Sequence, residues 1–139
     1  MAENSTNETT LKIGDRMADG TVFAGFSPYT NKPMYTTLAD APQTYTFSQA
    51  KTYAAKLDAC GHKDWRVPTK SELNVLFKNR VATGGFHETG SYPAGWYWSS
   101  SQVDDITGWG QRFSDGREDY GIKFDAWSLR CVRGESFSQ

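Results

Sequence analysis

The chain has 139 residues, with 15 Lys or Arg against 16 Asp or Glu, and a formal net charge of −1. This length is typical of one domain with a single core. The near-neutral balance argues against a protein that gathers nucleic acid or anionic membrane by charge. No apolar stretch approaches the roughly 20 residues that span a bilayer, so no membrane insertion is expected.

The two ends of the chain differ in composition from the middle. Residues 1–10 are rich in Asn, Thr and Glu, and they predict a disordered polar tail. They lack the apolar stretch of a signal peptide, so no leader is predicted. The sequence does not indicate the cellular compartment. Residues 11–134 predict a single domain, and residues 135–139 a short C-terminal tail.

Short strands are predicted in the first part of this domain. Asp19-Gly20 is a turn signal between the runs Lys12–Met17 and Thr21–Phe26, which predicts a β-hairpin. After a loop with two prolines, Met34–Thr37 predicts a further short strand.

Two helices are predicted next, each opened by a capping box in which Thr is followed three residues later by Gln or Glu. The boxes are Thr46 with Gln49 and Thr69 with Glu72. Apolar residues at helical spacing follow each box, which predicts helices over 47–60 and 70–80. Between them, Trp65 is interpreted as a core residue and Arg66 as structural rather than ligand-binding.

In the last third of the chain, residues assigned to one face alternate with residues assigned to the other with a period of two, which indicates strands. The predicted strands are Trp96–Gln102, Trp109–Phe113, Tyr120–Phe124 and Ser128–Arg133, with a turn at Ser114-Asp115-Gly116. Strands and helices occupy separate parts of the chain, so the fold class is α+β. We expect two helices packed on a small twisted antiparallel sheet with long loops.

The sequence carries no recognised catalytic motif. His62 and His87 both fall in loop-like settings without an evident orienting partner. There is no nucleophile elbow, phosphate loop, zinc-binding H-E-x-x-H or EF-hand loop. The carboxylates that could hold calcium are interpreted as solvated turn residues, because no further oxygen ligands occur at loop spacing. They are Asp104, Asp105, Asp115, Glu118 and Asp119. We therefore expect no enzyme, no metal and no cofactor.

Two cysteines, Cys60 and Cys131, lack the C-x-x-C spacing of zinc or redox sites. Their spacing leaves two interpretations open. They are buried thiols, as is usual in a cytoplasmic chain, or they form a long-range disulfide, which would add about 4 kcal/mol in the chain-entropy model.

The C-terminal third concentrates aromatic and charged residues of the types that dominate binding interfaces. Four of them are assigned to the core: Trp98, Trp109, Phe113 and Phe124. The others exceed what one face of a small sheet can bury, and loops on a rigid scaffold commonly carry recognition. The alternative is that they fill a β-rich core. The predicted ligand-binding residues are Tyr97, Asp104, Asp105, Thr107, Arg112, Arg117, Asp119, Tyr120, Lys123, Asp125 and Trp127.

Four blocks of the sequence resemble the bacterial Lcl C-terminal domain family. The first, Asp64–Leu73, resembles the family signature D-W-R-L-P-T-x-x-E-L, and Tyr97–Ser101 is similar to its strand Y-W-S-S-S/T. The third, Trp109–Gly116, resembles its hairpin A-W-x-x-x-F-x-x-G. The fourth, Leu129–Arg133, resembles its closing V-R-C-V-R. The blocks occur in the family's order and cover about residues 45–133, which makes the combination specific.

The resemblance implies a C-type-lectin-like fold and a family that is often extracellular, whose best-known member is the tip of a collagen-like bacterial adhesin. In that fold a cysteine of the first helix often pairs with one of the last strand, which implies a disulfide between Cys60 and Cys131. The calcium motifs of sugar-binding lectins, E-P-N or Q-P-D with W-N-D, are absent. The close cysteine pair of the related formylglycine-generating enzymes is also absent. Neither activity is implied.

Three functions are carried forward. The first is a non-enzymatic module that binds a protein or glycan. The second is a variable protein of a diversity-generating retroelement, because such proteins share this fold and display hypervariable residues near the C-terminus. Their counterparts here would be Asp104, Asp105, Thr107, Gly110, Arg117, Asp119, Tyr120, Asp125 and Trp127. The third is a structural module that acts by oligomerising.

Overall fold

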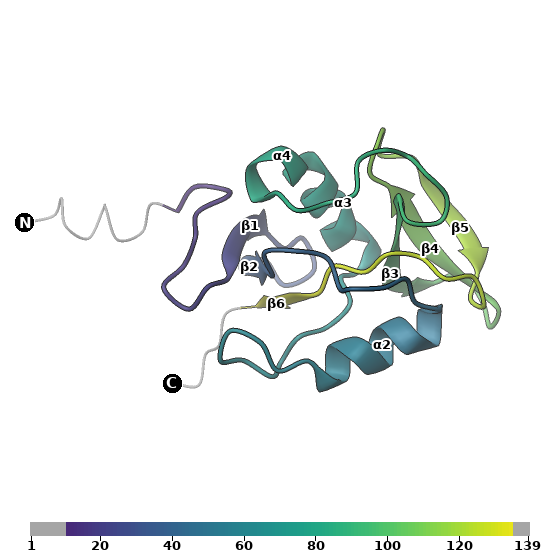
Figure 1. Ribbon diagram of the computed structural model, residues 1–139, viewed down its shortest axis with the longest axis horizontal. Coiled ribbons are helices and arrows are strands. Elements are labelled where there is room, and N and C mark those ends of the chain that lie inside the picture. The colour runs from purple at the N-terminus through teal and green to yellow at the C-terminus, as the bar shows by residue number, and fades with distance from the viewer. Residues whose placement is uncertain (1–10, 135–139) are drawn as a thin grey trace, which may run out of the picture.

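The computed structural model describes residues 11–134, and the tails predicted at 1–10 and 135–139 lie outside this range. The fold is α+β, as predicted, with helices and strands in separate parts of the chain (Figure 1). The helices are α2 (Phe47–Lys56), α3 (Lys70–Lys78) and α4 (Arg80–Thr83). The strands are β1 (Val22–Phe26), β2 (Pro33–Thr36), β3 (Trp96–Gln102), β4 (Thr107–Arg112), β5 (Glu118–Ile122) and β6 (Val132–Gly134).

Over residues 11–134 the strands form two antiparallel sheets rather than one. One sheet has the order β1-β2-β6 and the other the order β3-β4-β5. The predicted closing strand 128–133 therefore does not join the C-terminal sheet throughout. Ser128 makes a single bridge to Tyr97, and the chain then crosses to pair β6 with β2. The segment ties the two sheets together (Figure 1).

The predicted N-terminal hairpin forms only in part. The turn at Asp19-Gly20 is present, with Gly20 at φ 95°, but the first arm is reduced to a bridge between Arg16 and Val22. Its beginning folds over on itself, because the backbone N–H of Asp15 donates to the carbonyl of Lys12 at 2.9 Å. β1 pairs instead with β2.

Both helices begin at the capping boxes that the sequence predicts. The side chains of Thr46 and Thr69 accept from the backbone N–H groups of Gln49 and Glu72. Helix α2 ends at Lys56, four residues before the predicted end, because residues 59–62 close a tight turn. Cys60 and Gly61 hold left-handed φ values of 56° and 77° in that turn, which a continuing helix does not allow.

The core consists of two apolar clusters with β3 between them. Trp96 and Trp98 pack into a cluster with α2, Trp65 and Leu129. Tyr97 points to the opposite side and packs with α3, Phe113 and Val132. Both faces of β3 are therefore buried at its first four residues. No helix within the described part of the chain is long and apolar enough to cross a membrane.

Candidate functional site

Glycines of β4 and β5 lie on the inner face of the β3-β4-β5 sheet, and aromatic rings cover this face. Gly108 pairs with Gly121 across β4 and β5. A Cβ added at Gly110 or Gly121 would lie 2.2 or 2.5 Å from the ring of Trp127, and one at Gly108 would lie 2.6 Å from Phe47. The missing side chains thus provide the space in which these rings lie flat on the sheet.

Trp127 is therefore a core residue, and its assignment to the ligand-binding surface is wrong. Only 3% of its surface is exposed. Its ring stacks on Trp98 with centroids 4.0 Å apart and lies 5.3 Å from Trp96. The alternation of residues in sequence did not reveal this, because the ring packs on glycines of two other strands.

Tyr97 was also predicted at the surface, and it is fully buried. Its ring lies 4.3 Å from that of Phe113. Its hydroxyl donates to the carboxylate of Asp40 and accepts from the backbone N–H of His87 at 2.7 Å. Burial, together with the negative charge of Asp40, raises the pKa of Tyr97 well above its ordinary value. This hydroxyl is thus a donor within the core and is not available to a ligand.

Asp40 joins Tyr97 to a buried arginine. The Nε of Arg130 donates to Asp40 at 3.0 Å, and its two terminal nitrogens donate to the carbonyls of Thr37 and Gly84 at 3.0 and 3.1 Å. Burial raises the pKa of Asp40, although the Arg130 guanidinium and the Tyr97 hydroxyl oppose the effect. The network satisfies a fully buried guanidinium and connects three distant segments.

Of the four aromatic residues predicted in the core, two are buried. Trp98 and Phe113 are fully enclosed. Trp109 is half-buried on the outer face, with the ammonium of Lys70 at 3.9 Å from its ring centroid. Phe124 is 83% exposed, so its assignment to the core is wrong. The reason is that β5 ends at Ile122 and residues 123–125 form a turn, which breaks the alternation.

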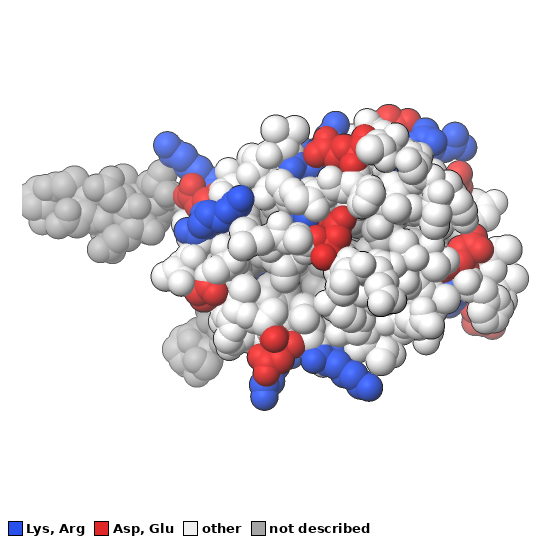
Figure 2. Space-filling model, viewed as in Figure 1, with Lys and Arg blue, Asp and Glu red and all other residues white. Residues whose placement is uncertain are grey.

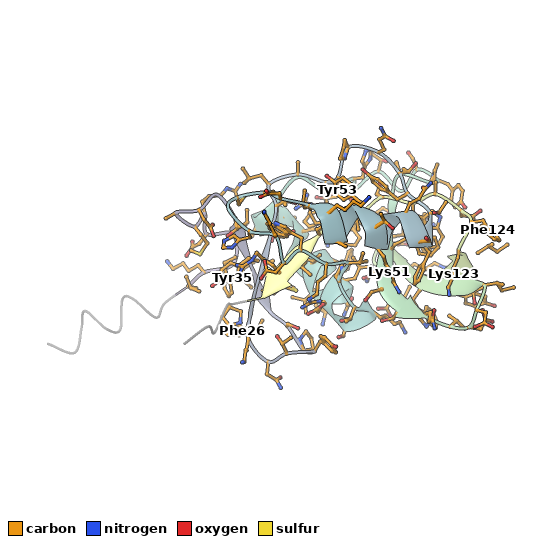
Figure 3. The ribbon with its side chains drawn as sticks, turned by 90° about the horizontal axis from the view of Figure 1, so that it is seen from below. Phe26, Tyr35, Lys51, Tyr53, Lys123 and Phe124 are labelled. Atoms are coloured by element: carbon orange, nitrogen blue, oxygen red, sulfur yellow. The ribbon has the colours of Figure 1, made fainter. Side chains whose placement is uncertain are left out.

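Four apolar side chains stand exposed at the end of the C-terminal sheet, and we call them the apolar tip: Val103, Ile106, Ile122 and Phe124. Ile122 pairs with Thr107 in the sheet. The β3-β4 turn and the turn after β5 are joined by a hydrogen bond from the N–H of Lys123 to the carbonyl of Ile106, at 2.8 Å. Figure 3 shows Phe124 at the extreme end of the molecule, beyond Lys123.

Predicted charged residues surround this tip. Asp104 accepts from the backbone N–H groups of Ile106 and Thr107 at 3.0 and 2.8 Å, so it also holds the turn. These bonds and that from the Thr107 hydroxyl, the largest effect, lower the pKa of Asp104. Asp105 is exposed. Asp125 accepts from the hydroxyl of Tyr92 at 2.9 Å.

Lys123 lies beside the tip, and its positive charge contributes to the lowered pKa of Asp104. Its ammonium donates to the side-chain carbonyl of Gln102 at 2.7 Å and lies 4.9 Å from the ring of Phe47. The ammonium of Lys51 lies 4.7 Å from the same ring. Both lysines lie toward the side of the molecule that α2 covers (Figure 3).

The remaining predicted residues line the other part of the sheet. Arg112 forms a bidentate pair with Asp115, at 3.0 and 2.6 Å, and this pairing lowers the pKa of Asp115 to about 2. Arg117 pairs with Asp119 at 3.3 Å. Tyr120 is exposed, and its ring meets Trp109 edge-on at 5.9 Å. These charges are largely compensated in pairs, whereas the uncharged side chain of Tyr120 is 58% exposed.

The sequence did not reveal a partner for His62, but its Nε2 lies 2.7 Å from a carboxylate oxygen of Asp19. Asp64 receives two hydrogen bonds from Arg133, at 2.7 and 3.1 Å. Within residues 11–134, no group of three His, Cys, Asp or Glu residues could hold a metal ion.

Both cysteines are free thiols, so the disulfide implied by the resemblance is not formed. Cys60 lies in the left-handed turn after α2 rather than on the helix, where the pairing would place it. Cys131 is buried in the α2 cluster, and burial raises its pKa to about 12. The two residues border the same cavity of about 300 Å³.

Arg66 has the structural role that the sequence indicates. Its guanidinium forms a bidentate pair with the buried Glu72, at 2.6 and 2.8 Å. Glu72 also accepts from the hydroxyl of Ser27 at 2.5 Å and from the N–H of Thr69 at 2.9 Å. Burial alone would raise the pKa of Glu72, but these hydrogen bonds lower it.

The structure thus removes two residues from the predicted binding surface and adds exposed apolar residues to it. Tyr97 and Trp127 leave it, while the other nine predicted residues are at least partly exposed. Sequence reasoning placed the loop of residues 103–108 on the candidate surface without naming Val103 or Ile106 as contacts, and it missed Ile122. A usable signal existed, since Ile122 continues the alternation of Tyr120 and Ile106 is an apolar residue inside an acidic turn.

The comparisons with known proteins give one match. The family model described as the Lcl C-terminal domain matches residues 16–133. No curated protein matches the chain.

Proposed function

This chain belongs to the Lcl C-terminal domain family, and we propose that it is a non-enzymatic module that binds a protein or glycan through the β3-β4-β5 sheet and its turns. One observation carries the proposal. Of the eleven large apolar side chains exposed in residues 11–134, six lie on this sheet or in loops that contact it. They are Tyr92, Val103, Ile106, Tyr120, Ile122 and Phe124.

The physical argument is that large apolar side chains exposed in one region of a protein surface commonly mark an interaction site. The tip combines Phe124 and Ile106, at 83% and 60% exposure, with the half-exposed Ile122. The inner face of the sheet, where the glycines of β4 and β5 contact aromatic rings and Trp127 stacks on Trp98, provides a rigid support. A surface held in one geometry before binding loses less conformational entropy when a ligand arrives.

The test is a screen of the purified chain on glycan and protein arrays at matched salt, with and without a calcium chelator. We expect binding that chelation leaves unchanged. The double variant Tyr120→Ser/Ile122→Ser should bind at least tenfold more weakly, because burial of each apolar side chain contributes to affinity. Val81→Ser on α4 is the control, because Val81 is an exposed apolar residue elsewhere.

Three results would contradict the proposal. They are no ligand above background on either array, equal binding by the double variant, and loss of binding on chelation, which would require a metal site.

A second candidate function is a variable protein of a diversity-generating retroelement. Seven of the nine candidate variable positions lie at least partly exposed on the same sheet or its turns, which favours this function. Gly110 and Trp127 do not fit it, because they pack against each other and substitution would disturb the core. A template repeat and a reverse transcriptase gene beside the coding gene would support this function, and their absence would exclude it.

A further inference from the structure

The tip also indicates what class of ligand it fits. We propose that Val103, Ile106, Ile122 and Phe124 bind a protein segment in which an apolar anchor side chain is flanked by Lys or Arg. This inference rests on the proposed function and narrows its ligand from protein or glycan to a basic protein segment.

The first step concerns the chemistry of the tip itself. Three of its four side chains are aliphatic, and the fourth is Phe, so none can exchange hydrogen bonds with a ligand. A sugar bound there would lose hydrogen bonds between its hydroxyl groups and water without replacement. An apolar protein side chain has no such cost and gains from removing both surfaces from water. The tip therefore favours a protein anchor over a glycan.

The second step concerns charge. The turn between β3 and β4 carries Asp104 and Asp105 between Val103 and Ile106, and Asp125 follows Phe124. Lys123 is the one cation in residues 103–106 and 123–125, and its ammonium donates to Gln102. Its charge offsets part of that of Asp104, so the three carboxylates leave a net negative charge at the tip. Carboxylates are visible at the end of the molecule where β4 and β5 lie (Figure 2). A ligand with cations beside its apolar anchor complements this field.

The negative charge of these carboxylates disfavours the other ligands that an apolar surface could bind, namely a second copy of the chain, an anionic membrane and acidic glycans. Two tips brought together as a dimer would place Asp104, Asp105 and Asp125 of one copy against those of the other, and like charges at an interface are costly. An anionic lipid surface, which attracts basic rather than acidic segments, would be repelled. Acidic glycans would be repelled for the same reason.

The experiment selects ligands without assuming their sequence. A display library of random peptides is selected on the immobilised chain, and binding of the enriched peptides is measured on four variants. Phe124→Ser and Asp105→Lys alter the tip. Val81→Ser and Asp58→Lys are matched controls on α4 and beyond the end of α2, far from the tip (Figure 1). Asp105 makes no side-chain hydrogen bond within residues 11–134, so its reversal should leave the fold intact.

We expect the enriched peptides to share an aromatic or aliphatic residue flanked by Lys or Arg. Their affinity should fall at least tenfold on Phe124→Ser. On Asp105→Lys it should fall about three- to tenfold, with the difference shrinking at high salt, because exposed charges are screened. The two controls should bind as the wild type does.

Several outcomes would overturn the inference. They are a library without enrichment, enrichment of acidic peptides, and equal binding by Phe124→Ser. Binding to vesicles of phosphatidylcholine and phosphatidylserine that Phe124→Ser abolishes would identify a membrane surface instead. Self-association in light scattering that Phe124→Ser abolishes would identify a second copy.

Failure of the inference is distinguishable from failure of the proposed function. Suppose that peptides or array ligands bind Phe124→Ser as tightly as the wild type but no longer bind Tyr120→Ser. That result would contradict binding at the tip and would still support recognition by the sheet. Absence of any ligand in both the array and the library would overturn both.

Discussion

At the scale of single residues, the structure exchanges the roles of two aromatic side chains. Trp127, predicted as a surface residue, is 3% exposed, and Phe124, predicted in the core, is 83% exposed. Gly110 and Gly121 explain the first reversal, because they leave room for an indole ring on a sheet face. The end of β5 at Ile122 explains the second.

The exchange predicts opposite results for two substitutions. Trp127→Ala should lower the free energy of unfolding by about 3–5 kcal/mol, because it leaves a cavity beneath stacked rings. Tyr120→Ala should change it by no more than about 0.5 kcal/mol, as is usual at exposed positions. Urea denaturation of both variants measures the difference. Equal losses would mean that Tyr120 belongs to the core.

At the scale of elements, the same capping motif serves two helices with different results. In α2 the Gln49 side chain accepts only from the backbone of Thr46, at 3.0 Å, and is exposed. In α3 the corresponding Glu72 is buried and also binds Ser27 and Arg66. The second box therefore fixes the start of α3 to the β1-β2 loop as well as capping the helix.

This difference predicts unequal costs for equivalent changes. Gln49→Ala should reduce the free energy of unfolding by a few tenths of a kcal/mol, since it removes one exposed hydrogen bond. Glu72→Ala should reduce it by about 2–3 kcal/mol, because the buried Ser27 hydroxyl and the partly exposed Arg66 guanidinium both lose their partner. Thermal and urea denaturation compare the two. Similar losses would show that Glu72 acts only as a cap.

At the scale of the whole molecule, a buried polar network links segments that lie far apart in sequence. Asp40 follows β2, Tyr97 lies in β3 and Arg130 precedes β6, and the three side chains meet through hydrogen bonds. The segment that carries Arg130 is also the one that crosses from one sheet to the other. The network thus connects this crossing segment and the loop after β2 to β3.

A double-mutant cycle tests this role. Asp40→Ala and Arg130→Met should each cost about 3–5 kcal/mol, because each leaves a buried charge without its partner. The double variant should cost less than the sum by more than about 1 kcal/mol. The pair Arg117 and Asp119, at the surface, is the control and should show a coupling of about 0–1 kcal/mol. Additive losses at Asp40 and Arg130 would contradict the network.

The features that depend on near neighbours could be predicted from the sequence. Capping boxes fixed where α2 and α3 begin, and alternation placed β3 at Trp96–Gln102, because caps and strand periodicity are set by residues a few positions apart. The family blocks likewise identified the family that the comparison confirms. The acidic turn at Asp104 followed from local composition, whereas the surface location of Tyr120 was predicted from its residue type and not from alternation.

Which side of each strand is covered depends on the tertiary fold and could not be predicted from local sequence. β3 is buried on both faces because α2 lies on one and α3 on the other, and neither helix is adjacent to it in sequence. Trp127 is buried because glycines of β4 and β5 receive its ring, and β6 pairs with β2 about a hundred residues earlier. Burial is a property of what packs on a residue, and here the packing partners come from distant parts of the chain.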